Sequence, residues 1–395
     1  MYGAIREWSG IVPQRVIAVI NSERMIDTFM ALVRIDSLSR EEGKIAERLV
    51  RELKSLKGEV YTDDAGAKVG GDSGNIIARF PGSKPGEPIL LSAHMDTVVP
   101  GRGIKPIRQP DRIRSDGTTI LGADDKSGIA IILEVLSVLN ERRISHPPVE
   151  VVFTICEEAG LVGAKHLDVR SLRSRHGLVL DSCPADSLFT RGPAADKLEF
   201  TVHGLAAHAG VCPEEGLNAI KIASEAIARM RLGRIDVDTT ANLGLIDGGS
   251  AVNIVPDRVI VRGEARSHDE SKLAAQASHM AECFRDAVRT HRVVKDGREV
   301  HARVEEKIER DYPRMTLGDD APIVKWVLSA SANLKVPMAC QKTGGGCDAN
   351  VFNGHGLNVA NLGTGMREIH TVNEHLLLRE FEQTARVVLE MLRAL

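Results

Sequence analysis

Residue types that can bind metal ions or transfer protons recur in this sequence where short apolar runs end. The first two, His94 and Asp96, follow the apolar run 88–91 and are separated by one residue. A histidine can bind a metal ion through one ring nitrogen while a nearby carboxylate holds the other nitrogen or a neighbouring ligand. His-x-Asp also arises by chance, and a loop histidine with a local hydrogen bond is the simpler alternative. Further residues of these types stand at the ends of later predicted strands: Asp124, Asp125, Glu157, Glu158, Asp181 and His370.

The number and types of these residues favour two metal ions rather than one. A hydrolytic site with a single zinc ion needs three protein ligands and an open position. Two histidines and several carboxylates are enough for a pair of ions that share a bridging carboxylate. Such mixed ligands suit zinc best, with manganese and cobalt as alternatives. Of the adjacent Glu157 and Glu158, one can bind metal while the other carries a proton from water to a leaving amine. Each acid alone is more simply a helix cap or a surface charge, so the prediction rests on their joint occurrence.

The predicted elements would bring these residues to one edge of a sheet. Continuous apolar runs alternate with helical periodicity, which indicates an α/β fold with a mostly parallel sheet covered by helices. In such a sheet the carboxyl ends of the strands form the ligand-binding crevice. The predicted strands are 75–80, 88–93, 149–155, 178–180 and 358–362. The predicted helices include 41–56, the stretch that follows the motif 122–128, 161–172 and 377–395.

Residues 192–312 follow a different pattern and predict a separate domain. The predicted strands here are 198–202, 241–246, 258–265 and 300–308, and the predicted helices are 218–230 and 269–290. The order β-α-β-β-α-β is that of a ferredoxin-like α+β unit. We therefore predict a catalytic domain in two parts, 1–191 and 313–395, with the domain 192–312 inserted between them. Residues 1–20 have no pattern that places them.

Composition argues against several classes of protein. The net charge is −3, from 51 basic and 54 acidic residues, and 3% of the residues are aromatic. These values predict neither a nucleic-acid partner nor an anionic membrane surface as a partner. No apolar run approaches the roughly 18 residues of a membrane span, and the N-terminus lacks the hydrophobic core and cleavage site of a signal peptide. The six scattered cysteines form no Cys-x-x-Cys pair, which indicates free thiols and predicts a cytoplasmic protein.

Six stretches together resemble a known enzyme family: 92–97, 122–128, 156–160, 181, 206–210 and 365–370. They are similar to the di-zinc metallopeptidases that include peptidase T, glutamate carboxypeptidase and aminoacylase. The resemblance extends from about residue 20 to the C-terminus. Within the family, Gly-Ala-Asp-Asp-Lys-Ser-Gly at 122–128 and Gly-Gly-Gly-Cys-Asp-Ala-Asn at 344–350 resemble peptidase T-like members most.

The resemblance implies a role for each residue of the predicted site. Its five metal ligands would be His94 and Asp181 on one ion, Glu158 and His370 on the other, and Asp124 between the two. Asp96 would orient His94, and Glu157 would be the general base and acid. The peptide bond between Asp124 and Asp125 would be cis.

The resemblance also implies that the inserted domain forms a homodimer. His208, in the stretch 206–210, would reach the active site of the partner and stabilise the oxyanion. Asn253 and Arg266 resemble residues that contact substrate, and an arginine there could hold a peptide carboxylate with two hydrogen bonds. A surface position remains the alternative for Arg266, and a plain loop histidine for His208.

We predict a metal-dependent exopeptidase that removes the N-terminal residue from short peptides, tripeptides in particular. The same di-metal site would also suit an amidohydrolase of N-acyl amino acids or a carboxypeptidase, and a non-catalytic binding protein is a third alternative. Many relatives have threonine or serine at the position of Cys347, so this chain departs from the family pattern there. Cys347 has no evident base partner and is interpreted as a packing residue.

Overall fold

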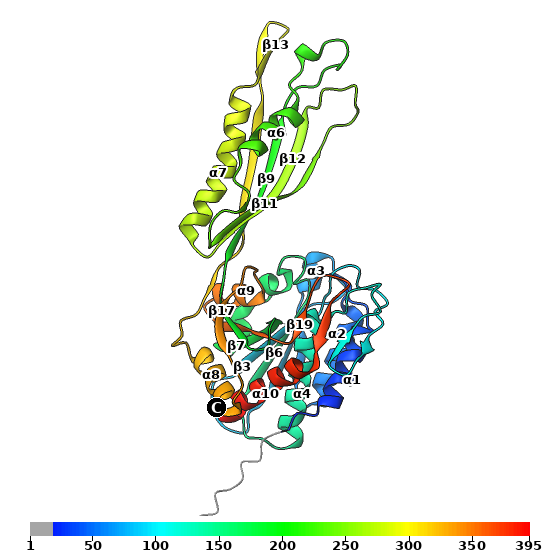
Figure 1. Ribbon diagram of the computed structural model, residues 1–395, viewed down its shortest axis with the longest axis vertical. Helices are drawn as coiled ribbons and strands as arrows, with labels where there is room; N and C mark the ends of the chain where they lie inside the picture. Colours follow the sequence, from blue (N-terminus) through cyan, green and yellow to red (C-terminus); the bar gives the residue numbers. More distant parts are fainter. Residues whose placement is uncertain (1–18) are drawn as a thin grey trace, which may run out of the picture.

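The computed structural model describes residues 19–395, so the predicted domain limit at residue 1 lies outside the described residues. The molecule is elongated, and its two lobes are built around separate sheets (Figure 1). The larger lobe contains both ends of the described chain, and the smaller lobe is built from the elements between Ala194 and Tyr312. No helix among residues 19–395 is long and apolar enough to cross a membrane.

The larger lobe is organised around a nine-stranded sheet. Its strands in spatial order are β1 (Glu59–Thr62), β2 (Ile76–Phe80), β6 (Val149–Thr154), β3 (Ile89–His94), β7 (His176–Ser182), β18 (Asn358–Gly363), β8 (Ser187–Gly192) and β16 (Met315–Thr316), with β17 (Ala339–Lys342) beside β8. The four central strands, β6, β3, β7 and β18, are parallel to one another. Both outer regions contain antiparallel pairs, so the parallel character that the apolar runs predict belongs to the centre of the sheet.

Helices cover both faces of this sheet because its central strands are apolar on both sides. Leu91 and Ala93 of β3 belong to the same core as α1 (Ser22–Val33), α2 (Gly43–Ser55), α4 (Ala123–Glu141), α8 (Pro322–Leu334) and α10 (Leu378–Ala394). Leu90, on the opposite side of the same strand, packs in a second core with α5 (Val162–His166) and α9 (Asp348–Gly354). Successive side chains of a strand point to opposite faces, so one strand contributes to both cores.

The smaller lobe has an antiparallel sheet of five strands with its own core. The strands in spatial order are β10 (Gly233–Arg234), β11 (Thr239–Gly248), β12 (Arg258–Ser267), β9 (Ala194–His203) and β15 (Arg303–Tyr312). Helices α6 (Ala219–Arg229) and α7 (Glu270–Arg289) pack on the sheet. The chain order β9-α6-β11-β12-α7-β15 is the β-α-β-β-α-β order that the sequence predicts.

Three details differ from the sequence prediction. The predicted strand 300–308 is divided between a hairpin, β13 (Arg292–Lys295) with β14 (Arg298–His301), and the start of β15. The predicted helix 161–172 ends early, and a short 3₁₀ turn follows at Val169–Ser171. A four-stranded sheet of very short strands is also new: β19 (Met366–Arg367), β20 (His375–Leu377), β5 (Arg112–Arg114) and β4 (Ile107–Arg108). A short helix, α3 (Ala65–Val69), completes the larger lobe.

Candidate metal centre and active site

The first group of candidate ligands lies at the carboxyl ends of the central strands. His94 is the last residue of β3, and Asp181 lies near the end of the neighbouring parallel strand β7. Asp124 lies at the start of α4, where its backbone is not yet helical. His94 Nε2 is 3.0 Å from Asp124 Oδ1 and 3.8 Å from Asp181 Oδ1. The structure therefore brings together all three residues predicted for the first ion.

The second group shares Asp124 with the first. His370 Nε2 is 2.8 Å from Glu158 Oε1 and 3.2 Å from Asp124 Oδ2. Glu158 follows strand β6, and His370 lies in the loop between β19 and β20. The two carboxylate oxygens of Asp124 thus face different histidines, Oδ1 facing His94 and Oδ2 facing His370. This is the arrangement of a bridging ligand between two ions. Zinc is well suited to this mixture of imidazole and carboxylate groups.

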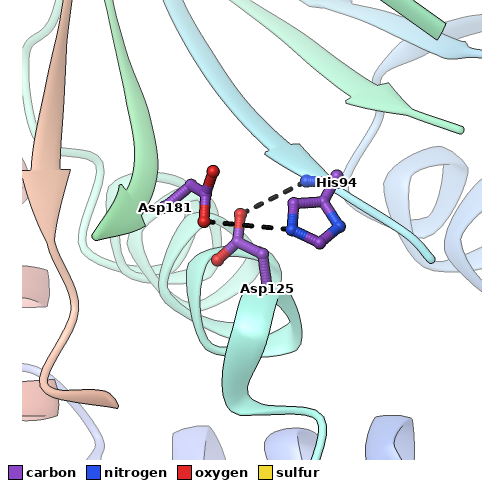
Figure 2. A group of neighbouring side chains, drawn as sticks. All are labelled: His94, Asp125 and Asp181. Atoms are coloured by element: carbon purple, nitrogen blue, oxygen red, sulfur yellow. Dashed lines mark hydrogen bonds and ion pairs between the residues drawn. The ribbon is translucent and has the colours of Figure 1, made fainter. Parts of the chain in front are cut away.

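Asp125 is an alternative to Asp124 as a metal ligand in the first group. The side chains of His94, Asp125 and Asp181 point toward one another (Figure 2), and their ligand atoms are close enough to hold an ion. However, Asp125 Oδ2 accepts the backbone N–H of His94 at 3.2 Å and Oδ1 accepts that of Gly128 at 3.1 Å. Both oxygens already fix backbone groups, so Asp125 is better suited to position His94. The peptide bond between Asp124 and Asp125 is cis, which confirms that prediction.

Asp96 links the first histidine to the acidic pair after β6. Its Oδ1 lies 3.3 Å from His94 Nδ1, the nitrogen that faces away from the proposed ion. The same carboxylate accepts the backbone N–H groups of Glu157 at 2.9 Å and Glu158 at 3.2 Å. The Ser39 hydroxyl donates a further hydrogen bond of 2.6 Å. Asp96 can therefore orient His94 and hold the turn that carries Glu157 and Glu158.

Glu157 lies in a cleft of about 610 Å³ between the two lobes. We call this the acidic cleft, because its lining includes six carboxylates: Asp124, Glu157, Glu158, Asp181, Glu264 and Asp311. Burial raises the pKa of Glu157 well above its usual value, and the nearby charge of Asp348 raises it further. A carboxyl group with a raised pKa is suited to accept and return a proton near neutral pH.

The charge balance of the acidic cleft fits bound cations. Burial and the charges of Asp124 and Asp125 raise the pKa of Asp181 well above its usual value. Burial lowers the pKa of His94, but hydrogen bonds with Asp124 and Asp96 outweigh burial and raise it overall. Buried charges of one sign are costly unless they are paired or bind a metal ion. Two divalent cations would supply the missing positive charge.

Three buried charged residues support the site and were not predicted from the sequence. The Glu374 carboxylate accepts the backbone N–H groups of Leu121, Gly122 and Asp124 at 2.7, 2.8 and 3.0 Å. Glu42 Oε1 accepts the N–H of Cys156 at 2.9 Å, just before Glu157. Lys126 is fully buried and donates to Ser37 Oγ at 2.9 Å. Lys126 stands inside the motif 122–128, but for Glu42 and Glu374 the sequence contains no signal beyond their being acidic.

The three residues predicted to act on substrate are not all in one place. Arg266 lines the acidic cleft, and Arg266 Nη2 donates to Glu264 at 2.9 Å. His208 and Asn253 are exposed and do not line this cleft. They belong to two loop stretches that pair with each other, through Ala209 N–H to Asn253 O at 2.9 Å.

The loops of His208 and Asn253 follow the far end of the small sheet. In β9, Ala195 pairs with Arg266, whereas His203 pairs with Arg258. A strand rises about 3.3 Å per residue, so these two ends of β9 are about 26 Å apart. His208 and Asn253 therefore do not reach the acidic cleft of their own chain in this structure.

Comparison with known proteins places these features in a family. The model of peptidase family M20/M25/M40 matches residues 90–394. The chain is 40% identical to the uncharacterised protein YqjE of Bacillus subtilis, over 95% of this chain and 99% of that protein. A crystal structure of aminopeptidase PepT from Bacillus cereus is similar with a TM-score of 0.83 and 41% identity, covering 95% of this chain and 98% of that one. A tripeptidase structure from Staphylococcus aureus has a TM-score of 0.87 and 36% identity, covering 95% and 99%. The resemblance drawn from the motifs is confirmed, and the chain belongs to peptidase family M20/M25/M40.

Proposed function

We propose that this protein is a two-metal exopeptidase that releases the N-terminal residue from short peptides, with tripeptides as its main substrates. One observation carries the proposal: two histidines face opposite oxygens of the single Asp124 carboxylate, at 3.0 and 3.2 Å, in the cleft that Glu157 also lines. The names of two similar proteins, an aminopeptidase and a tripeptidase, support the choice of peptide substrates and of the N-terminal end.

The residues of the cleft would have different roles in peptide hydrolysis. When bound, two divalent cations would supply Lewis-acid polarisation and would lower the pKa of water. We propose zinc, with manganese or cobalt as alternatives. His94, Asp124 and Asp181 would hold one ion, and Asp124, Glu158 and His370 the other. Glu157 would take a proton from the attacking water and give it to the leaving amine. Asp96 would keep His94 in the tautomer that binds metal.

The proposal includes a homodimer formed by the inserted domain 192–312. His208 is exposed beyond the end of the smaller lobe's sheet that is remote from the acidic cleft of its own chain. It can therefore act only in the active site of a partner copy, with Asn253 beside it. Apolar side chains are exposed on the same lobe, including Leu245 at 63% and Ile246 at 59%. The half of β11 that contains them pairs with β12 only, and an open strand edge is a natural place for another chain to pair.

We also propose a cytoplasmic location. All six cysteines are unpaired, as expected in a reducing compartment.

The test is a panel of substrates incubated with zinc, manganese or cobalt, and with a chelator. The panel contains tripeptides, dipeptides, N-acetyl amino acids and C-terminally amidated tripeptides. We expect amino acids to be released from tripeptides, and we expect the chelator to abolish the release. Activity on N-acetyl amino acids instead would identify an amidohydrolase with the same site. No reaction in any arm, with two metal ions bound per chain, would favour a non-catalytic binding protein.

A further inference from the structure

We infer that a pocket of the larger lobe, remote from the acidic cleft, binds a free α-amino acid with an apolar side chain. We call it the amino-end pocket, because its lining includes residues at the amino ends of β3 and β6. Its volume is about 370 Å³, and sites for small ligands have about 300–1,000 Å³. Val149, at the start of β6, lines the pocket, whereas Glu157 follows the other end of that strand. At about 3.3 Å per residue, β6 spans about 17 Å between them.

Arg79 is a cation held in a fixed position in the lining of the amino-end pocket. It lies on β2 between Glu59 of β1 and Glu150 of β6, because these residues are direct partners across adjacent strands. Arg79 Nε donates to Glu150 Oε1 at 3.0 Å, and Nη2 donates to the backbone oxygen of Ser171 at 2.9 Å. In the described part of the chain, Nη1 has no hydrogen-bond partner. A held guanidinium with an available N–H group is suited to bind a carboxylate.

Two more cations and one acid in the lining have charges that no neighbouring group pairs. Lys57 follows α2, Arg173 precedes β7, and Glu59 begins β1; all three are exposed. Within residues 19–395, their side chains form no hydrogen bond or ion pair. Glu150, by contrast, is fully engaged, because its second oxygen accepts two backbone N–H groups, both at 2.9 Å. The pocket therefore offers unpaired charge of both signs, with cations in excess.

The rest of the lining is apolar and rigid. It consists of Phe80, Val149 and three prolines, Pro81, Pro88 and Pro148. A proline has a fixed φ angle and no N–H group, so this wall offers no backbone donor at three of its five positions. An apolar side chain that covered the wall would be removed from water, which is favourable in proportion to the apolar area that it buries.

An apolar α-amino acid matches all three parts of this lining. Its carboxylate would bind Lys57, Arg173 and Arg79 Nη1, and cationic donors bind carboxylates more strongly than neutral donors do. Its ammonium group would pair with Glu59, and its side chain would cover the apolar wall. A phosphate would meet the same cations, but Glu59 would repel it and the wall would stay exposed to water. Free amino acids are also what an exopeptidase releases. The sensing of product, unlike the binding itself, rests on the proposed function.

The test measures the Kd of leucine and of two analogues by titration calorimetry on the full chain with its metal ions. Leucinamide lacks the carboxylate, and 4-methylpentanoate lacks the ammonium group. For a ligand of this size we expect a leucine Kd on the order of 0.1–1 mM. Each analogue should bind about tenfold more weakly, the usual effect of losing one charge-assisted hydrogen bond. Glycine, which has no side chain to cover the wall, should also bind more weakly than leucine.

Variants of the lining locate the binding. Lys57→Gln with Arg173→Gln should weaken leucine binding about tenfold and remove most of the preference for leucine over leucinamide. Glu59→Gln should instead remove most of the preference for leucine over 4-methylpentanoate. The control is Lys54→Gln with Arg175→Gln, which removes the same two charges from exposed neighbouring positions outside the lining and should keep the parent Kd.

A parent leucine Kd in the double lining variant, with a parent melting temperature, would show that leucine binds elsewhere and would overturn the inference. No leucine binding to the parent protein would overturn it as well. Both results would leave the proposed function standing, because the panel of peptides tests that function separately. Conversely, a parent protein that binds leucine in this pocket but releases no amino acid from any peptide would overturn the proposed function alone.

Discussion

At the scale of single residues, Glu157 is the group whose loss should stop turnover without removing metal. It lines the acidic cleft and is only 8% exposed, and it is not among the five proposed ligands. Glu157→Gln keeps the shape of the side chain but cannot accept the proton, so kcat should fall by about 100- to 10,000-fold. Metal content, measured by mass spectrometry, should equal that of the parent.

The matched control for Glu157 is Glu87→Gln, which makes the same change at an exposed position and should keep the parent kcat. If Glu157→Gln hydrolysed peptides as fast as Glu87→Gln, Glu157 would not be the proton carrier.

Cys347 lies in the same cleft, and the structure predicts that it is unreactive. Burial raises the pKa of its thiol to about 12, so the thiol is protonated at neutral pH and forms thiolate only in strong alkali. Iodoacetamide at pH 7–8 should therefore not modify it, as peptide mass mapping would show. Cys347→Ser should keep most of the activity, because a hydroxyl can also accept the hydrogen bond that Asn361 donates to Cys347 Sγ. Inactivation in proportion to alkylation of Cys347 would contradict this prediction.

At the scale of elements, the loop before α4 depends on one buried acid. Glu374 binds three backbone N–H groups around Asp124, so Glu374→Ala should let the shared carboxylate of Asp124 move. Supporting residues of this kind typically contribute 10- to 100-fold to metal affinity. We expect an affinity loss of that order in a competition titration with a chelator, compared with Glu87→Ala. A lower melting temperature with unchanged metal affinity would show that Glu374 only stabilises the fold.

The sequence predicted the elements that carry the ligands because those elements have strong local patterns. The continuous apolar runs that became β3, β6 and β7 fix where His94, Glu157 and Asp181 lie. The four-stranded sheet of β4, β5, β19 and β20 was not predicted. Its strands have two or three residues, too few for a pattern, and β5 pairs with β20 more than 250 residues away in the chain. Glu374, just before β20, was missed for the same reason, since its partners are distant in sequence.

At the scale of the whole molecule, the proposed dimer predicts that two impaired variants can complement each other in one assembly. His208→Ala should reduce turnover and leave metal content unchanged, because His208 is remote from the ligands of its own chain. Mixing His208→Ala with Glu157→Gln should restore activity, since a mixed dimer has one site with both groups intact. With random pairing about a quarter of all sites would be active. Activity no higher than the sum of the two separate variants would rule out a shared site.

The division into lobes could be predicted from the change of pattern near residue 192, but the place of His208 could not. Spacing along the chain does not show that β9 carries residues 203–208 away from the cleft, whereas its register with β12 does.

The most direct test of the two-metal exopeptidase is the first product released from a tripeptide of three different residues. The enzyme is incubated with zinc, and free amino acids and dipeptides are identified by mass spectrometry at low conversion, with a parallel sample in chelator. We expect the free N-terminal residue and the dipeptide of the remaining two in equal amounts, and neither product in chelator. Release of the C-terminal residue first, or equal release with and without chelator, would contradict it.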